Sequence, residues 1–492
     1  MRDNSRSARC GWLAMIRVLR SGDNGWYICE HRDKHNHPLS TTCGEKLHWP
    51  SHRHIDKYTK ELVKHLRDNN VSLGKVYNII GSYFGGMDNV PFTKRSLKTL
   101  CGKISREQSD QDDVKTMEVF SAMQDADPRF KYSVQIGDDS RIKTLMWTSG
   151  TCIEKYACFG DVLSFDMTYR TNLYDMSFRL FVGVNNHFQT VVLGGVLMRD
   201  EKVESFKWVF AEFMRMIGGK DNHLKTILTD QARAMELAIS EVMPNTTHRW
   251  SKWHVLNRAK ECLGALYSKQ SEFRSEFHKL VSELYIEDEF KKGWATLIGR
   301  YGLEKQPFLM QIYEVRRKWA MPYFRNVFCA SMTSTQRRES ANHVLKGYVP
   351  PGCPMHLFEK QYDKLQFDKD SEESYQEKRT SIASAVQRFN LPLEIHASKV
   401  YTRMMFEQFG KRLYESGQYN VEEMELHKMY LNEEVSCECG LFEHSGMICA
   451  HALKVMLHLG FKTIPARYVL KRPDEVWISA REGNRIVVWG VV

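Results

Sequence analysis

Long apolar runs are missing from this chain of 492 residues. One of the longest, residues 191–198, is far shorter than the roughly 20 residues that a helix needs to cross a bilayer. Cysteine is also sparse, with 12 residues in the whole chain, which excludes a scaffold held together by many disulfides. The N-terminus shows no signal-peptide pattern, so we expect reduced thiols, an intracellular protein and no membrane partner.

Charge of one sign does not dominate either. Lysines and arginines number 70 against 60 acidic residues, a net charge of +10, and no dense basic run of the nuclear-import kind stands out. This moderate basic bias permits nucleic-acid binding but does not require it. The hydrophobic content of 42% and the aromatic content of 12% are typical of a well-packed globular protein, here long enough for two or three domains.

A compact array of possible metal ligands lies near the C-terminus, and it consists of Cys437, Cys439, Cys449 and His451. Thiolates and an imidazole are ligands that Zn²⁺ takes in a tetrahedral site. Because the protein would fill all four positions, the metal would contribute to folding and would leave no open position for catalysis. The C-x-C-x9-C-x-H spacing matches that of a SWIM zinc finger, and the apolar run after Cys449 predicts a helix beneath the metal.

Residues 1–44 predict a β-hairpin with part of a second zinc site. Alternating residues on both sides of a turn at about residues 21–25 are typical of such a hairpin. Cys10, His35 and His37 supply three candidate zinc ligands, but the fourth ligand expected upstream is missing. Cys29 is either a substitute ligand or a small buried apolar side chain. The segment is therefore either a zinc-dependent DNA contact or a metal-free fragment of a larger finger.

Helical spacing of apolar residues follows in residues 45–114. We expect three short helices there, and the last one carries the basic residues Lys94, Arg95, Lys98 and Lys103. This segment is either a helix-turn-helix reader of DNA or a helical connector with a solvated basic face. The polar and charged composition of residues 105–114 predicts a linker.

From residue 115 the pattern changes to β-rich runs. Three strands, an amphipathic helix over residues 203–217 and a buried strand ending in Asp230 follow in the order of a ribonuclease H-like core, whose first strand ends in Asp166. We therefore predict an α/β (α+β) fold over residues 115–350, with a helical insertion at about residues 255–330.

Three acidic residues of this core are candidates for a DNA-cleaving site. Neighbouring strands would bring Asp166 and Asp230 to one edge of the sheet, and Glu339 is the candidate third acid. Carboxylate oxygens are the ligands that Mg²⁺ requires, and a pair of such ions can cleave a phosphodiester. A single aspartate at a strand end is more often a turn or cap residue, but the three together predict transposase triad positions. Mg²⁺ is expected only if this triad is active.

Several stretches of the chain resemble the plant far-red-impaired-response family, transcription factors domesticated from Mutator-like transposases. The similar stretches are residues 11–18, 35–37, 159–172, 226–231, 253–254, 335–340, 399–406 and 464–472, together with the C-terminal zinc array. The resemblance implies a nuclear, non-enzymatic regulator of light-responsive or developmental genes. It also implies promoter or terminal-repeat-like DNA targets, and homo- or heterodimers with related proteins.

The same resemblance implies a division of the chain. Residues 1–44 would be a partial WRKY/GCM-type finger, and a helical region at residues 351–425 would precede a SWIM finger at 426–465 and a tail at 466–492. Three features depart from the family pattern: the absent first cysteine of the N-terminal finger, Ser251 in place of a cysteine, and the sequence after Arg472. Two other functions remain open, an active transposase that cleaves DNA with Mg²⁺ and a zinc-stabilised interaction module without DNA contact.

Overall fold

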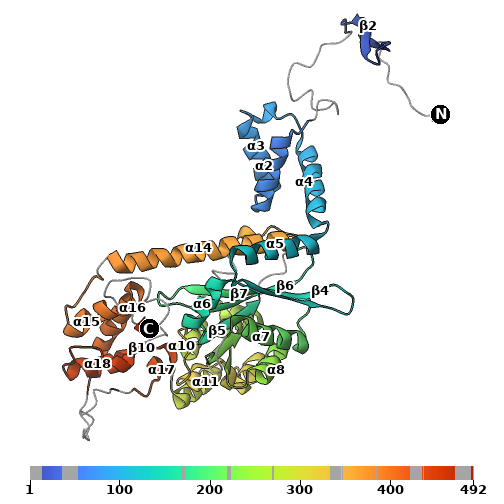
Figure 1. Cartoon of the computed structure of the whole chain (residues 1–492). Coiled ribbons are helices and arrows are strands. Elements are labelled where there is room, and N and C mark those ends of the chain that lie inside the picture. Colours follow the sequence, from blue (N-terminus) through green and yellow to red (C-terminus); the bar gives the residue numbers. More distant parts are fainter. Residues whose placement is uncertain are drawn as a thin grey trace. The chain divides into compact units, whose positions relative to one another are not determined.

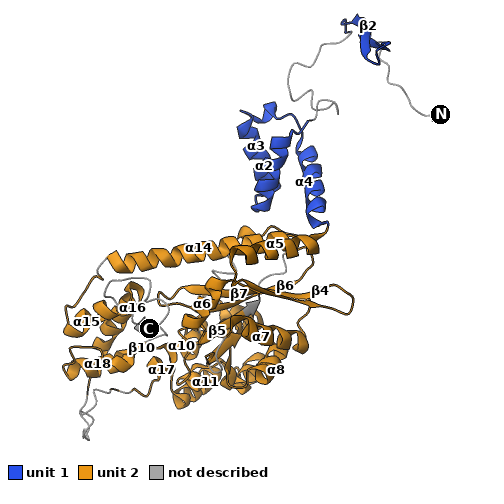
Figure 2. Cartoon of the chain, viewed as in Figure 1, with its two compact units in different colours: residues 1–110 blue, residues 111–492 orange. Residues whose placement is uncertain are grey.

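The computed structural model describes residues 14–35, 54–167, 172–218, 223–268, 271–332, 345, 347–382, 385–421, 435, 437–470 and 489–490. The chain divides into two compact units, Met1–Asp110 and Gln111–Val492 (Figure 2). Across these described ranges, no helix combines the length and the apolar character needed to cross a membrane.

The described residues of the first unit form a hairpin and three longer helices (Figure 1). Strands β1 (Met15–Arg20) and β2 (Trp26–Arg32) pair antiparallel around the predicted turn. The helices are α2 (Lys57–Asp68), α3 (Leu73–Tyr83) and α4 (Lys94–Ser109), with a 3-10 turn η2 at Met87–Asn89. Side-chain oxygens of Asp56, Ser72 and Thr93 cap the three helices, whose apolar faces form one small core.

The predicted linker at residues 105–114 is largely helical. Helix α4 continues to Ser109, and helix α5 (Asp112–Ala126) begins three residues later. The stretch contains neither glycine nor proline, the residues that most strongly disfavour a helix. Its polar and charged side chains are therefore compatible with helices whose surface is exposed to solvent. The break is confined to Asp110 and Gln111, where Gln111 adopts a left-handed φ of 52°.

The second unit is built on a seven-stranded sheet with the order β3-β4-β7-β6-β5-β8-β9. The strands are β3 (Lys131–Ile136), β4 (Ile142–Thr148), β5 (Val162–Met167), β6 (Ser177–Val184), β7 (Thr190–Met198), β8 (Thr226–Thr229) and β9 (Thr247–Trp250). Strands β5, β6 and β7 are antiparallel, β8 is parallel to β5, and β9 is parallel to β8. The predicted α/β class and strand order are confirmed. The sequence pattern did not reveal β9.

Helices cover both faces of this sheet (Figure 1). Helices α6 (Gly150–Phe159), α7 (Val203–Ile217) and α8 (Arg233–Val242) contribute to the core on one face, where Phe210 and Phe213 of α7 pack on Phe165 and Phe181. Helices α5 and α14 (Met355–Ile382) pack on the other face. The bounds of α7 agree with the prediction, because its large apolar residues recur at helical spacing.

Asp112 of α5 caps the beginning of α14. Its carboxylate accepts hydrogen bonds from the backbone amides of Met355 and His356, over 2.7 and 3.2 Å, and from the hydroxyl of Tyr174 over 2.9 Å. The His356 Nδ1 atom lies 2.5 Å from the same carboxylate. Burial would raise the pKa of Asp112, but these hydrogen bonds, first the one from His356, lower it overall. The start of the second unit is thereby joined to its longest described helix.

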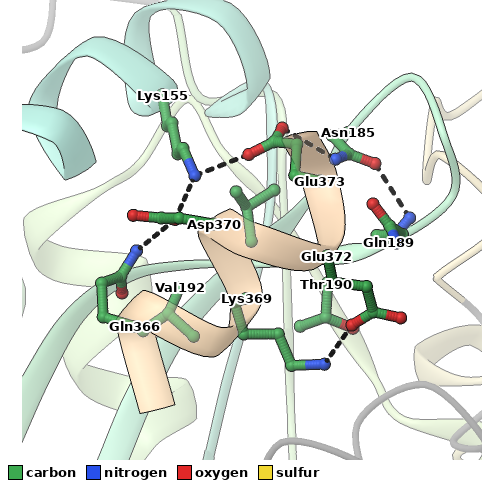
Figure 3. A pocket seen from close by; sticks show the side chains of 11 residues that line it. Lys155, Asn185, Gln189, Thr190, Val192, Gln366, Lys369, Asp370, Glu372 and Glu373 are labelled. Carbon is green, nitrogen blue, oxygen red and sulfur yellow. Dashed lines mark hydrogen bonds and ion pairs between the residues drawn. The ribbon is translucent and has the colours of Figure 1, made fainter. Parts of the chain in front are cut away.

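A seam of polar side chains ties α14 to α6 and to the turn after β6 (Figure 3). The Lys155 Nζ atom lies 2.5 Å from Asp370 Oδ1 and 2.6 Å from Glu373 Oε2. The side-chain amide of Asn185 donates to Glu373 over 2.8 Å. Burial would lower the pKa of Lys155, but the carboxylates of Glu373 and Asp370 raise it overall, so this lysine stays charged. The pocket in Figure 3 is therefore an ion-pair network that fixes α14.

The predicted helical insertion has its own aromatic core. It consists of α9 (Lys252–Leu263), η3 (Gly264–Tyr267), α10 (Glu272–Glu283), α11 (Glu287–Tyr301), α12 (Pro307–Glu314), η4 (Arg316–Lys318) and η5 (Met321–Phe324). The segment after α14 contains α15 (Pro392–Val400), α16 (Arg403–Glu415), η6 (Ser416–Gln418), α17 (Leu441–Ser445), α18 (Ala450–His458), η8 (Ala466–Tyr468), β10 (Val469–Leu470) and β11 (Trp489–Gly490). Its apolar residues form one cluster with Val162, Val184 and Leu228 of the sheet, so it packs directly on the core.

Candidate functional site

The four predicted zinc ligands near the C-terminus lie together. Sulfur atoms of Cys437, Cys439 and Cys449 and a ring nitrogen of His451 all lie within 4.8 Å of one another. The Cys437 Sγ atom is 3.3 Å from Cys439 Sγ and 3.7 Å from His451 Nδ1. In a tetrahedral site with Zn–S bonds of about 2.3 Å, two sulfurs lie about 3.8 Å apart. The donor set and its spacing fit Zn²⁺ with every position filled by protein.

Local backbone geometry brings the two ligand pairs together. Gly440 and Gly446 adopt left-handed φ angles of 62° and 73° at the two ends of the short helix α17. A Cβ atom on Gly440 would lie 2.9 Å from the backbone oxygen of Arg325, so a larger residue would clash there. Cys449 caps helix α18, because its sulfur accepts the amide hydrogen of Ala452 over 3.3 Å. One ligand therefore also sets the start of the helix beneath the site.

The three thiols of this site cannot all ionise without a nearby cation. Hydrogen bonds from Cys439 and Cys449 lower the pKa of Cys437, and the hydrogen bonds to Cys437 raise the pKa of the other two thiols. Bound Zn²⁺ would supply the positive charge that allows all three to be thiolates. We therefore expect zinc binding to release protons and to stabilise the fold.

A buried arginine of the sheet anchors this zinc finger. The Arg249 Nη1 atom on β9 donates to His444 Nε2 of α17 over 3.1 Å. The opposite ring nitrogen of His444 lies 2.8 Å from the backbone oxygen of Phe324, so it carries the proton and donates to that oxygen. Burial and the charge of Arg249 lower the pKa of His444 to about 3, which keeps the ring neutral. The sequence analysis did not identify this pair. One signal for it was available, because His444 lies between the zinc ligands in the sequence but is not one of the four.

The two predicted catalytic aspartates occupy neighbouring strand ends. Strands β5 and β8 are adjacent and parallel, with Ser164 opposite Leu228. Asp166 and Asp230 each follow that pair by two residues, which brings their backbone positions to one edge of the sheet. The side chain of Asp166 and all of Glu339 lie outside the described residues. Of the predicted triad, the structure thus describes only the Asp230 carboxylate.

A guanidinium group already lies beside that carboxylate. Arg179 of β6 has no exposed side-chain surface, and its Nη1 atom lies 3.7 Å from Asp230 Oδ2. Its Nη2 atom is 3.4 Å from Glu201 Oε2, and its guanidinium stacks 5.0 Å from the ring centre of Phe206. A fixed positive charge at this distance repels a second cation. The Asp230 carboxylate is therefore already close to a cation of the protein, and sequence reasoning gave no role to Arg179.

The predicted N-terminal zinc ligands are described only in part. Cys10 and His37 lie outside the described residues, and His35 is an exposed residue just after β2. Cys29 is exposed, with its sulfur 3.4 Å from the backbone oxygen of Arg17, so the prediction of a small buried side chain is wrong. A two-stranded hairpin buries no residue unless another layer covers it.

Comparisons with known proteins agree with this architecture. Residues 162–258 match the model of the MULE transposase domain, and residues 423–460 match that of the SWIM zinc finger. Relatives in Arabidopsis thaliana extend the similarity along most of the chain. The chain is 29% identical to Protein FAR-RED IMPAIRED RESPONSE 1 over 93% of its own length and 58% of that protein. The two domain matches and these relatives together support the FAR1-like family of MULE-derived proteins.

Two further relatives give the same picture of this family. The chain is 29% identical to Protein FAR1-RELATED SEQUENCE 5 over 94% of its length and 61% of that protein. It is 28% identical to Protein FAR1-RELATED SEQUENCE 4 over 96% of its length and 66% of that protein. The chain thus spans about three fifths of the length of the relatives it matches. The zinc-finger match and the Cys/His cluster together point to zinc, whereas nothing in either supports Mg²⁺.

Proposed function

We propose that the protein is a nuclear, zinc-stabilised regulator of transcription that binds DNA, and that its transposase-derived core does not cleave the DNA. The name of the relative FAR-RED IMPAIRED RESPONSE 1 refers to a response to far-red light, which supports a role in light-responsive or developmental gene control. Promoter or terminal-repeat-like elements are the proposed targets. Homo- or heterodimers with related proteins are the proposed assembly.

The observation that carries the non-enzymatic part of this proposal is the Arg179–Asp230 pair. Two-metal cleavage needs carboxylates that are free to bind divalent cations. Here a fully buried guanidinium lies 3.7 Å from the Asp230 carboxylate, and Glu201 lies on its other side. This arrangement supports a core that keeps the transposase fold but does not assemble its metal centre.

An exposed basic face on α4 supports DNA contact. Lys94, Arg95 and Lys98 are exposed, and the described residues provide no acidic partner for them. Lys103, further along the helix, pairs with Glu107 over 3.7 Å. Unpaired basic side chains on one helix are suited to phosphate contacts, which give affinity that falls steeply with salt.

A mobility-shift titration tests DNA binding. The zinc-loaded full chain is mixed with short duplexes of random sequence at increasing salt, and the bound duplexes are recovered for sequencing. We expect a steep salt dependence, with the slope reduced by about 3 when Lys94, Arg95 and Lys98 are all changed to glutamine. The matched control changes the exposed Lys57, Lys60 and Lys64 of α2 to glutamine and removes the same net charge.

Each alternative function predicts a different result. An interaction module without DNA contact would shift no duplex at any salt concentration. An active transposase would nick the bound strand when Mg²⁺ or Mn²⁺ is added. Equal losses of binding in the α4 and α2 variants would show that net charge, rather than a particular helix face, drives association.

A further inference from the structure

A cavity of about 220 Å³ lies where the helical insertion meets the zinc finger. Its walls come from β9, α9, α10, α16 and α17, together with neighbouring loop residues. Basic, hydroxyl and amide side chains line much of it, namely Arg249, Lys252, Ser282, Gln408, Arg412 and Ser445. None of the four zinc ligands lines this cavity.

Among the described residues, two of the three cationic side chains that line the cavity have only neutral hydrogen-bond partners. Three of its side chains are cationic, and among the described residues no aspartate or glutamate lines the cavity. Arg249 donates to neutral acceptors, the His444 ring and the backbone oxygen of Trp319 over 3.2 Å. The Lys252 Nζ atom donates to the hydroxyl of Ser282 over 3.1 Å. Only Arg412 pairs with a carboxylate, that of Glu415 at 2.7 Å.

Buried charges with neutral partners are unfavourable. Moving a cation from water into a protein interior costs several kcal/mol unless an opposite charge lies nearby. Burial, followed by the charge of Arg249, lowers the pKa of Lys252 to about 8, so this lysine is still largely protonated at neutral pH. An anion in the cavity would remove this cost, and serine and glutamine side chains would provide further hydrogen bonds to it.

We propose that this cavity binds a small tetrahedral oxyanion, either inorganic phosphate or the phosphate group of a monoester. Arg412 and Lys252 would contact the anion directly, because both line the cavity and neither is held by the full set of contacts that fixes Arg249. Since His444 lies in the same lining, the bound anion would also stabilise the packing of the zinc finger on the core. This site is separate from the acidic edge at Asp230, which contributes nothing to the lining.

Calorimetric titration of the zinc-loaded full chain tests this site. Inorganic phosphate and phosphoserine are titrated separately at fixed ionic strength, with chloride as the comparison anion. We expect saturable phosphate binding that Lys252→Met weakens by about tenfold or more, whereas Lys260→Met, an exposed charge on the same helix, leaves it unchanged. Tighter binding of phosphoserine than of phosphate would identify a monoester as the ligand, and the reverse would identify the free ion.

A second variant covers the case in which Lys252→Met does not fold. Arg412 lines the cavity and is half-buried, so Arg412→Gln should weaken phosphate binding. In the absence of phosphate, the thermal unfolding temperature of this variant should stay close to that of the wild type. The proposal is overturned if the wild type binds phosphate no better than chloride. It is equally overturned if Arg412→Gln and Lys260→Met bind phosphate as the wild type does.

Discussion

Arg249 and His444 are 195 residues apart in the sequence and 3.1 Å apart in the fold, and both side chains are buried. The arginine belongs to the last parallel strand of the sheet, and the histidine belongs to the zinc finger. This hydrogen bond, together with the apolar cluster shared by the two regions, makes the finger an integral part of the second unit. Loss of the finger's structure should therefore destabilise the transposase-derived core.

Replacement of His444 by alanine should lower the free energy of unfolding by about 3 kcal/mol. The substitution removes a neutral acceptor from a fully buried guanidinium, and a buried charge that loses its partner is strongly unfavourable. Urea unfolding followed by circular dichroism measures the effect. His458→Ala, an exposed histidine in α18, is the control and should change stability far less. Equal losses in the two variants would contradict the anchoring role of His444.

The neutral state of His444 predicts how stability depends on pH. Its pKa is about 3 in the folded protein, compared with an ordinary value of 6.5. The unfolded chain therefore takes up a proton below pH 6.5 that the folded chain does not. The stability from this group is complete above pH 6.5 and is lost by about 1.4 kcal/mol per pH unit as the pH falls toward 3.

Unfolding of the wild type and His444→Ala at several pH values isolates this effect, because other groups titrate in both proteins. His248, whose pKa burial lowers to about 4, contributes with the same sign to each. Between pH 6.5 and 5, the wild type should lose more stability than the variant. Parallel pH profiles would contradict this prediction, because they would mean that folding does not lower the pKa of His444.

Asp112→Asn should destabilise the second unit by about 2 kcal/mol. In the wild type, both carboxylate oxygens of Asp112 accept hydrogen bonds, and the donors belong to Met355, His356 and Tyr174. The asparagine side chain replaces one of these acceptors with an NH₂ group, which would face those donors. Asp113→Asn is the matched control, since Asp113 is the next residue of α5 and is exposed. Thermal unfolding of both variants measures the difference. A neutral Asp112→Asn would show that the capping of α14 contributes little.

Cys449→Ser should lower the zinc content by about one ion per chain and should also lower the unfolding temperature. The hydroxyl of serine is a poor zinc ligand, and Cys449 both belongs to the ligand cluster and caps α18. Cys262→Ser, at an exposed cysteine of α9, is the control. Metal analysis and thermal unfolding give the two readouts, and unchanged zinc content in Cys449→Ser would refute the assignment of this ligand.

Features of the fold that depend on local pattern could be predicted from the sequence. The phenylalanines of α7 recur at helical spacing, and the C-terminal cysteines and histidine lie close along the chain. Strand β9 could not be recognised, because Thr-His-Arg-Trp shows no alternation of apolar and polar residues and is stabilised by its pairing with β8. Tertiary structure overrides local preference there.

The electrostatic partners at the candidate sites could not be predicted for a different reason. Arg179 lies in a strand whose other residues are mostly apolar, and only the fold shows that its guanidinium lies beside Asp230. The Arg249–His444 and Asp112–His356 pairs likewise join residues far apart in the sequence. Buried charged residues pair when the fold brings them close in space. For residues far apart in the sequence, no regular spacing in a single sequence reveals that proximity.

We propose above that the protein binds DNA and that its transposase-derived core does not cut it, because the Asp230 carboxylate already lies 3.7 Å from the Arg179 guanidinium. The most direct measurement is a strand-cleavage assay on the protein–DNA complex, with a duplex recovered from the mobility-shift titration or a terminal-inverted-repeat duplex, and with Mg²⁺ or Mn²⁺ added. We predict that the strands of the bound duplex stay intact with either metal. Nicking by the wild type that Asp230→Asn abolishes would contradict the account.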